Sequence, residues 1–317
     1  MNPAQKERES FWTGVWSIDK PVGPTSHDVV ATIRSRSRIK RVGHTGTLDP
    51  LASGVLVICV GKATRIIEYL ADDKEYEAEL QLGITTDTFD AAGKVTGEKP
   101  VPEITLGQLQ EVCQAFTGKI QQVPPMVSAK RHQGKRLYEL AREGKEVERK
   151  PVEVTIGKFE ILEFKSPLLK IRIVCTAGTY IRALANDLGQ ALGCGAHLKT
   201  LRRLRVGSFD IARTQTLPEW EKAWAEGKGR ETLIPLEKAV PHLPVIPVTA
   251  GNARVALTGR PLIMTDEECP GLAGADPFDP PYVSLILPDG SLFAIAQPKR
   301  KIRGWIIKAD KIFKTDV

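Results

Sequence analysis

Residues 43–54 read Gly-His-Thr-Gly-Thr-Leu-Asp-Pro-Leu-Ala-Ser-Gly, and they run directly into an apolar stretch from Gly54 to Val60. That stretch predicts a strand buried on both faces. A glycine-rich loop anchored by such a strand can hold a reactive group close to a ligand, because glycine permits backbone shapes that side chains forbid. The groups available for chemistry are His44 and Asp49. An aspartate before proline is often only a turn residue, and the Lys-Ser/Thr ending of a phosphate-binding P-loop is missing.

Strand and helix patterns alternate on both sides of this loop. Residues 15–19 predict a strand and 63–70 a helix, and Thr25 or Ser26 can cap a helix that runs to about Arg38. From Glu75 to Leu82 charged or polar residues alternate with apolar ones, which predicts a half-buried strand. Later patterns predict helices over 105–116 and 179–192 and strands over 152–164 and 168–175. Together they are typical of a mixed α/β or α+β fold.

The last part of the chain differs in composition. Pro241, Pro244 and Pro247 stiffen the stretch after Ala239, where we expect a domain boundary. Short β-like runs follow at 282–287, 292–295 and 305–307. They predict a small β-rich module over residues 244–317.

The distribution of charged residues indicates which class of molecule the protein binds. The 317 residues include 45 Lys and Arg against 38 Asp and Glu, a formal net charge of +7. Basic residues gather in four clusters without acids, each of which alone fits a solvated face, but which together favour a nucleic-acid surface. The clusters are Arg34 to Arg41, Lys130 to Arg136, Lys199 to Arg205 and Lys299 to Arg303.

Cysteine content and hydropathy indicate the compartment. The five cysteines contain no C-x-x-C pair, which argues against a disulfide framework and a zinc ribbon and indicates a reducing environment. No apolar run approaches the ~18 residues that cross a bilayer. We therefore expect a cytoplasmic protein with no membrane partner.

The 43–54 segment resembles the Gly-His-Thr-Gly-x-Leu-Asp-Pro-Leu-Ala-Ser/Thr-Gly motif of the TruB family of tRNA pseudouridine synthases. Further matches to that family follow in the family's order over roughly residues 15–217. They are Asp19-Lys20-Pro21, Lys74-Glu75-Tyr76, Gly83 to Asp90, Gln122 to Met126, Gly178-Thr179-Tyr180-Ile181-Arg182, Gly193 to His197 and Leu201-Arg202-Arg203-Leu204. An ordered series of this length is far more specific than any one of its motifs.

The resemblance implies an isomerase that flips a uridine out of the tRNA T-arm at position 55 and converts it to pseudouridine. It implies an α+β fold, with a mixed, largely antiparallel sheet flanked by helices and a small PUA-like C-terminal domain. The domains would be a catalytic domain over 1–243, with an RNA-clamping insertion around 120–144, and an RNA-binding domain over 244–317. The family uses no cofactor and no metal, and we expect a monomer whose partner is tRNA.

The resemblance also assigns the site residues. Asp49 is the catalytic aspartate, and Arg182 pairs with it, whereas the pattern alone fits an ordinary exposed helix residue equally well. Tyr76 would stack on the flipped uracil, although its pattern favours simple core packing. The remaining substrate contacts would come from four residues, each of which also fits a purely structural role: His44, Tyr180, Leu201 and Lys20.

Two other functions are compatible with parts of this pattern. A tRNA-binding or folding chaperone would use the same surfaces without chemistry. A hydrolytic glycosidase usually needs two suitably spaced carboxylates, and Asp87 and Asp90 look like loop-capping residues instead. Whether Asp49 attacks the sugar, attacks the base or removes a ribose proton is left open by the sequence.

Overall fold

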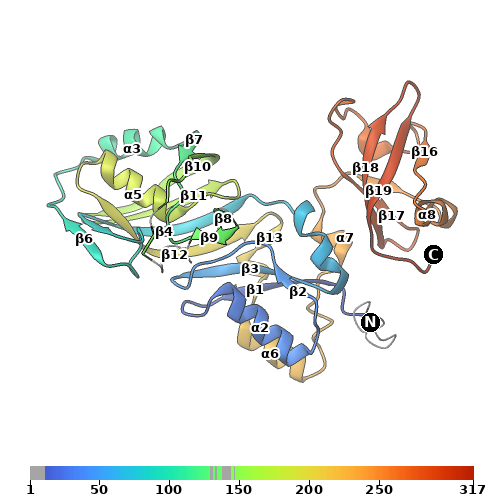
Figure 1. Ribbon diagram of the computed structural model, residues 1–317, viewed down its shortest axis with the longest axis horizontal. Helices are drawn as coiled ribbons and strands as arrows, with labels where there is room; N and C mark the ends of the chain where they lie inside the picture. Colours follow the sequence, from blue (N-terminus) through green and yellow to red (C-terminus); the bar gives the residue numbers. More distant parts are fainter. Residues whose placement is uncertain (1–10, 129–130, 133, 138–143, 146) are drawn as a thin grey trace.

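A long, mostly antiparallel sheet forms the larger part of the molecule (Figure 1). The computed structural model describes residues 11–128, 131–132, 134–137, 144–145 and 147–317. Within them the sheet has ten strands, paired in the order β14-β1-β3-β12-β4-β11-β10-β7, with β2 beside β3 and β13 beside β12. In that order the path strands are Gln215–Thr216, Gly14–Lys20, Ala52–Val60, Ala196–Val206, Lys74–Leu82, Leu168–Cys175, Val152–Lys165 and Gly118–Gln122, and the two side strands are Val42–His44 and Phe209–Asp210.

The sheet is mixed because two of its pairings are parallel. β12 runs parallel to β3 and β14 runs parallel to β1, while the other neighbours are antiparallel. The expected α+β class with a mixed, largely antiparallel sheet is therefore confirmed. As expected, β3 is buried almost throughout, and along β4 buried and half-buried residues alternate strictly.

Helices cover the two halves of this sheet separately (Figure 1). α2 (Ser26–Ser37) and α6 (Leu217–Ala225) pack on β1 and β3 through a core that includes Trp16 and Trp220. α3 (Leu106–Ala115) and α5 (Ile181–Ala191) pack on the other half through a core that includes Leu80 and Leu184. The predicted helix start at Thr25 is confirmed, since its hydroxyl and the Asp28 carboxylate form a reciprocal capping box.

The sequence interpretation was wrong about the segment before β4. Instead of an α-helix over 63–70, two 3₁₀ turns occur, η1 (Gly61–Arg65) and η2 (Ile67–Tyr69). Within the two turns the buried side chains are Ala63, Ile66 and Tyr69, every third residue, and Leu70 directly after η2 is buried as well. A spacing of three matches the three residues per turn of a 3₁₀-helix. Positions 63, 66 and 70 also fit one face of an α-helix, which is why the sequence pattern predicted one.

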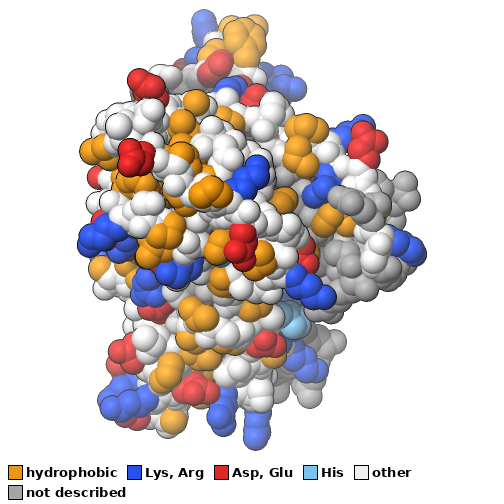
Figure 2. Space-filling model, turned by 90° about the vertical axis from the view of Figure 1, so that its left-hand side faces the viewer, with side chains coloured by type: hydrophobic (Ala, Val, Ile, Leu, Met, Phe, Trp, Pro, Cys, Tyr) orange, Lys and Arg blue, Asp and Glu red, His pale blue; other side chains and the backbone are white. Residues whose placement is uncertain are grey.

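The third basic cluster is also not the open surface that we expected. It lies on β12, a strand that the pattern did not predict. Three of its members pair with carboxylates on neighbouring elements: Lys199 with Glu79 at 3.0 Å, Arg202 with Asp19 at 2.7 Å and Arg205 with Asp73 at 2.5 Å. The fourth, Arg203, is 1% exposed. On the face drawn in Figure 2, basic and acidic side chains are likewise interspersed.

A second sheet of five strands begins at Val245 and forms a β-rich C-terminal unit, as expected. Its order is β15-β17-β18-β19-β16, and α8 (Ala250–Leu257) packs beside it. The strands are Val245–Pro247, Val283–Ile286, Leu292–Arg300, Trp305–Ile312 and Leu262–Met264. Short elements complete the description: β5 (Ile84–Thr86), β6 (Val95–Glu98), β8 (Arg131–His132), β9 (Lys135–Arg136), η3 (Ile211–Arg213), α7 (Leu236–Ala239) and η4 (Pro270–Leu272).

The C-terminal unit docks on η1 and η2. Lys62 Nζ donates to the carbonyl of Phe313, and Arg65 donates to the carbonyl of Ile312 at 2.9 Å. The Tyr69 hydroxyl donates to Asp310. The Phe313 ring belongs to the same buried cluster as Val57 of the larger sheet. The two sheets therefore share one core at this contact.

Part of the expected RNA-clamping insertion, 120–144, lies outside the described residues. Within the described part, it begins at the end of β7 and contains the β8–β9 hairpin. Among the helices that the structure describes, none is both long and apolar enough to cross a membrane.

Candidate active site

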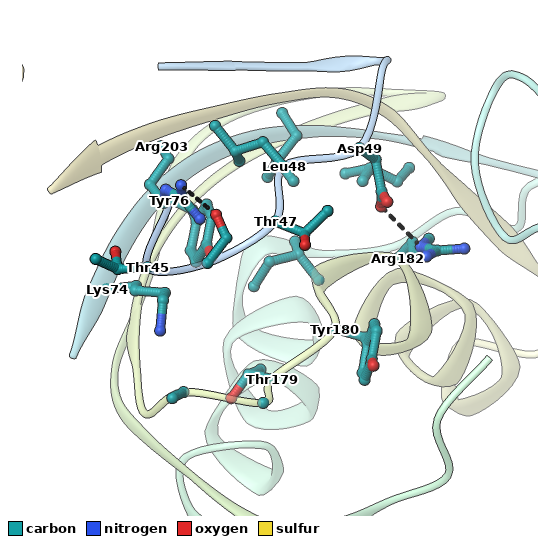
Figure 3. Close-up of a pocket in the computed structure, with 16 residues that line it drawn as sticks. Thr45, Thr47, Leu48, Asp49, Lys74, Tyr76, Thr179, Tyr180, Arg182 and Arg203 are labelled. Carbon is teal, nitrogen blue, oxygen red and sulfur yellow. Dashed lines mark hydrogen bonds and ion pairs between the residues drawn. The ribbon is translucent and has the colours of Figure 1, made fainter. Parts of the chain in front are cut away.

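A cavity of about 300 Å³ opens where the 43–54 loop meets the end of the sheet (Figure 3). The loop forms one wall, β4 and β12 form the floor, and the start of α5 with the turn before it forms the opposite wall. The described residues that line it are Thr45, Gly46, Thr47, Leu48, Asp49, Lys74, Tyr76, Ala177, Gly178, Thr179, Tyr180, Ile181, Arg182, Leu198, Leu201 and Arg203.

Gly54 fixes how closely the loop approaches β12. Its φ is +106°, and an added Cβ would stand 2.1 Å from the carbonyl oxygen of Arg203. Any other residue would force the loop and β12 apart. The sequence motif therefore ends in glycine for a steric reason.

Asp49 and Arg182 meet at one side of this cavity. Arg182 Nε lies 3.1 Å from Asp49 Oδ2, and the arginine side chain is 4% exposed while the aspartate side chain is 41% exposed. Arg182 also donates to the carbonyl of Val127 at 2.6 Å. The interpretation of Arg182 as an exposed helix residue is wrong, because the guanidinium is buried and aimed at the loop.

The electrostatics of Asp49 result from two opposing effects. Loss of solvation raises the pKa of Asp49, and the nearby charge of Asp90 adds to the rise. Arg182 is the main group that opposes this, with a smaller contribution from Lys20. The carboxylate thus stays open to a ligand on one side and is stabilised in its charged form by a cation on the other.

Tyr76, Tyr180 and Leu201 line the same cavity from three different elements. Tyr76 is 6% exposed and lies on the buried face of β4, so it belongs to the core and faces the cavity at once. Burial raises the pKa of Tyr76, and the Arg203 charge opposes that rise. Tyr180 directly precedes α5, and the Arg182 guanidinium lies 5.8 Å from its ring centre.

The two other expected residues, Lys20 and His44, are not among the described residues that line the cavity. Lys20 is fully buried, and its Nζ donates to the carbonyls of Pro21 and Pro24, both at 2.8 Å. Burial lowers the pKa of Lys20 to about 8. His44 lies in β2 opposite Ile58, and burial lowers its pKa.

Sequence reasoning missed Lys74 and Arg203. Lys74 is two residues before Tyr76, so the alternation along β4 already places both on one face. Arg203 belongs to a matched family motif, but no role was assigned to it, because β12 was not predicted and its basic residues were interpreted as a surface cluster.

Among the residues that the structure describes, no second carboxylate lines the cavity where a hydrolytic glycosidase would need one. Asp90 accepts hydrogen bonds from the Thr88 hydroxyl at 2.6 Å and the Ala92 amide at 3.0 Å, and Asp87 accepts from the Lys94 amide at 2.8 Å. Both therefore cap their own loop, as expected. Among the described residues that line the cavity, Asp49 supplies the one carboxylate.

Two domains known from one family of proteins match this chain in succession. The N-terminal domain of TruB family pseudouridylate synthases matches residues 34–181, and the C-terminal domain of tRNA pseudouridylate synthase B matches residues 182–241. The chain is 43% identical over 277 residues to a tRNA pseudouridine synthase B of Dehalococcoides mccartyi strain CBDB1, which is 87% of this chain and 92% of that relative. It is 45% identical over 315 residues to the protein of the same name from Moorella thermoacetica, 95% of this chain and 99% of the relative.

Solved structures with the same fold extend the similarity to the C-terminal unit. A chain in a crystal structure of a Cbf5–Nop10–Gar1 complex matches with a TM-score of 0.74 and 29% identity, over 98% of this chain and 87% of the other. A chain in an H/ACA RNP bound to a substrate RNA containing 2′-deoxyuridine matches with a TM-score of 0.70 and 27% identity, over 99% of this chain and 88% of the other.

Proposed function

This chain belongs to the TruB family of pseudouridine synthases and isomerises uridine to pseudouridine in tRNA, and we propose that Asp49 carries the chemistry on a uridine flipped out of the T-arm, at position 55. The observation that supports this most directly is the ion pair of 3.1 Å between Asp49 and the buried Arg182 at the side of a cavity that Tyr76 also lines.

Asp49 acts in its ionised form. The reaction breaks a carbon–nitrogen glycosidic bond and forms a carbon–carbon bond to the same ribose. A carboxylate can attack the sugar, add to the base or remove a ribose proton, and each of these steps needs the charged form. Arg182 therefore acts as the group that keeps Asp49 ionised in a poorly solvated place.

The flipped base is held by the aromatic and apolar walls. Tyr76 stacks on the uracil, with Tyr180 and Leu201 completing the pocket. His44 and Lys20 act outside the cavity in this proposal. His44, in β2, supports the loop of the tRNA T-arm. Lys20 fixes the turn before α2 and adds positive charge near Asp49.

The rest of the molecule binds the tRNA. We assign residues 1–243 to the catalytic domain, the stretch around 120–144 to an RNA clamp and residues 244–317 to a PUA-like RNA-binding domain. Recognition would depend on RNA shape and phosphate contacts, with a strong salt dependence. We propose a cytoplasmic monomer that needs no cofactor or metal, and the five free, buried cysteines are in keeping with a reducing compartment.

The test replaces the carboxylate without changing its shape. Asp49→Asn is expected to form no measurable pseudouridine in a T-arm stem-loop, assayed by chemical labelling, while its affinity for the RNA stays close to that of the wild type. Asp87→Asn is the matched control, because Asp87 caps its own loop and does not line the cavity. Substantial product from Asp49→Asn would refute the role of Asp49, and a wild type that binds RNA without forming product would favour the chaperone.

A further inference from the structure

One side of the cavity carries two cations that the mechanism above does not use (Figure 3). Lys74 and Arg203 lie across the cavity from Asp49 and Arg182. Lys74 is 8% exposed and Arg203 is 1% exposed. They flank Gly46, since a Cβ on that glycine would stand 3.6 Å from Lys74 Cε and 3.7 Å from Arg203 Nη1.

Neither cation has a carboxylate partner among the residues that the structure describes. Lys74 Nζ donates to the carbonyl of Asp72 at 2.8 Å, and Arg203 donates to the carbonyls of Val55 at 2.7 Å and Gly46 at 3.1 Å. Their situation differs from that of Arg182, which pairs with Asp49, and of Arg202, which pairs with Asp19. Buried charges without counterions are costly, so proteins rarely keep them without a use.

A third group on this side of the cavity is a buried hydroxyl that forms no hydrogen bond with the described residues. Thr45 lines the cavity, and its hydroxyl is buried and has no hydrogen-bond partner among the described residues. Leaving a buried hydroxyl unpaired costs stability. Burial and the neighbouring Arg203 charge both lower the pKa of Lys74, while Asp72, Asp73 and Cys175 act in the opposite direction. All three groups are thus better satisfied with an electron-rich ligand in the cavity than without one.

The isomerisation produces such a ligand by every route open to Asp49. If the ribose C1′–N1 bond breaks, its electron pair stays on the uracil and spreads to O2 and O4, while C1′ bonds to Asp49 or C2′ gives a proton to it. If Asp49 adds to C6 instead, the electron pair of the C5–C6 bond moves toward O4. In each route the C1′–N1 bond is broken, C5 bonds to C1′, and Asp49 is released by leaving C1′ or C6 or by returning its proton to C2′. C5 then loses its proton and N1 gains one, so the product is an isomer and no oxidant or reductant is needed.

We propose that Lys74, Arg203 and Thr45 form an electrostatic subsite that binds the uracil oxygens and stabilises the negative charge on the base while it is detached and turned. The inference rests on the proposed function and deepens it. Preorganised donors aimed at developing charge in a site that excludes water are an effective way to lower a barrier. The cationic side also keeps the detached uracil in the cavity, where Tyr76 stacks on it.

The test uses the leaving ability of the base. Sulfur holds negative charge better than oxygen, so a 4-thiouridine target depends less on the subsite than uridine does. Single-turnover rates are measured on T-arm stem-loops carrying either nucleoside, with RNA affinity measured alongside. Lys74→Met is expected to lose about 100-fold on uridine, clearly less on 4-thiouridine, and little RNA affinity. Lys74→Arg keeps the charge and most of the rate.

Two further variants keep the test decisive. Thr45→Val removes the unpaired hydroxyl, so it folds at least as stably as the wild type and still shows the larger loss on uridine; it serves if Lys74→Met does not fold. Lys170→Met is the control, because Lys170 pairs with Glu77 and does not line the cavity. Equal losses on both nucleosides, or losses confined to RNA affinity, would overturn the subsite. A wild type that forms no pseudouridine would instead refute the proposed function itself.

Discussion

Replacing Arg182 by methionine tests the electrostatic part of the mechanism. Coulomb's law gives about 4 kcal/mol for unit charges roughly 4 Å apart at an effective dielectric constant of ~20. The Asp49 side chain is 41% exposed, and screening by water roughly halves that value, to about 2 kcal/mol. Two kcal/mol corresponds to an ionised-to-protonated ratio of Asp49 that is about 30-fold lower at any pH.

The pH dependence gives this loss a recognisable form. Burial raises the pKa of Asp49 and Arg182 opposes the rise, so Arg182→Met raises the pKa further. The reaction needs the carboxylate, so activity is present above this pKa and is lost as the pH falls through it. We therefore expect the acid limb of the single-turnover rate to move to higher pH in Arg182→Met, with the deficit largest on that limb and smaller at alkaline pH.

The assay is the pH profile of pseudouridine formation in a T-arm stem-loop at saturating enzyme. Arg172→Met is the matched control, because Arg172 pairs with Glu77 on the sheet and does not line the cavity. Thermal melting of each variant separates loss of fold from loss of charge. If the rate of Arg182→Met falls by the same factor at every pH, Arg182 does not act by keeping Asp49 ionised, and the argument fails.

Three further predictions concern the Tyr76 ring, the glycine that ends the 43–54 loop and the contact between the C-terminal unit and the larger sheet. Tyr76→Leu should lower the single-turnover rate by about 5- to 150-fold, which corresponds to a stacking energy of roughly 1–3 kcal/mol for one base. Its affinity for the stem-loop should fall less. Equal rates for wild type and variant at saturating RNA would contradict the stacking role. Gly54→Ala should lower the free energy of unfolding in urea by at least ~2 kcal/mol, and by clearly more than Gly227→Ala, which has a similar positive φ but open space around it. Phe313→Ala should lower it by about 3 kcal/mol, because the ring is 4% exposed in the core shared by the two sheets; an unchanged urea midpoint would show that the units do not stabilise each other.

The sequence predicted those elements whose pattern is local and regular. The Thr25 capping box and the strict alternation along β4 are both readable within a few residues. β12 was not predicted because its pairing with β4 shifts register between Leu198 and Thr200 and again between Arg203 and Arg205. Each irregularity resets which face the next side chain takes, so no period of two survives in the sequence.

The site was predictable where a motif placed a residue and unpredictable where pairing across the sheet did. The family resemblance brought together Asp49, Arg182 and Tyr76, which the structure places around one cavity. It also suggested substrate contacts for His44 and Lys20, which are not among the described residues that line the cavity. Arg203 enters the cavity because β12 lies beside both β3 and β4, a contact between segments far apart in the chain.

The anchoring of the C-terminal unit on η1 affects how freely its sequence can drift. Lys62 and Arg65 donate hydrogen bonds to the main-chain carbonyls of residues 313 and 312, and every amino acid supplies such a carbonyl. Substitutions at those two positions leave the acceptors in place, whereas a change at position 62 or 65 removes the donor itself. Homologues should therefore vary more at position 312 than at positions 62 and 65, whereas position 313 stays restricted by its buried ring, and a designer who grafts a different C-terminal module onto this enzyme needs to match both the backbone path and an apolar side chain at position 313.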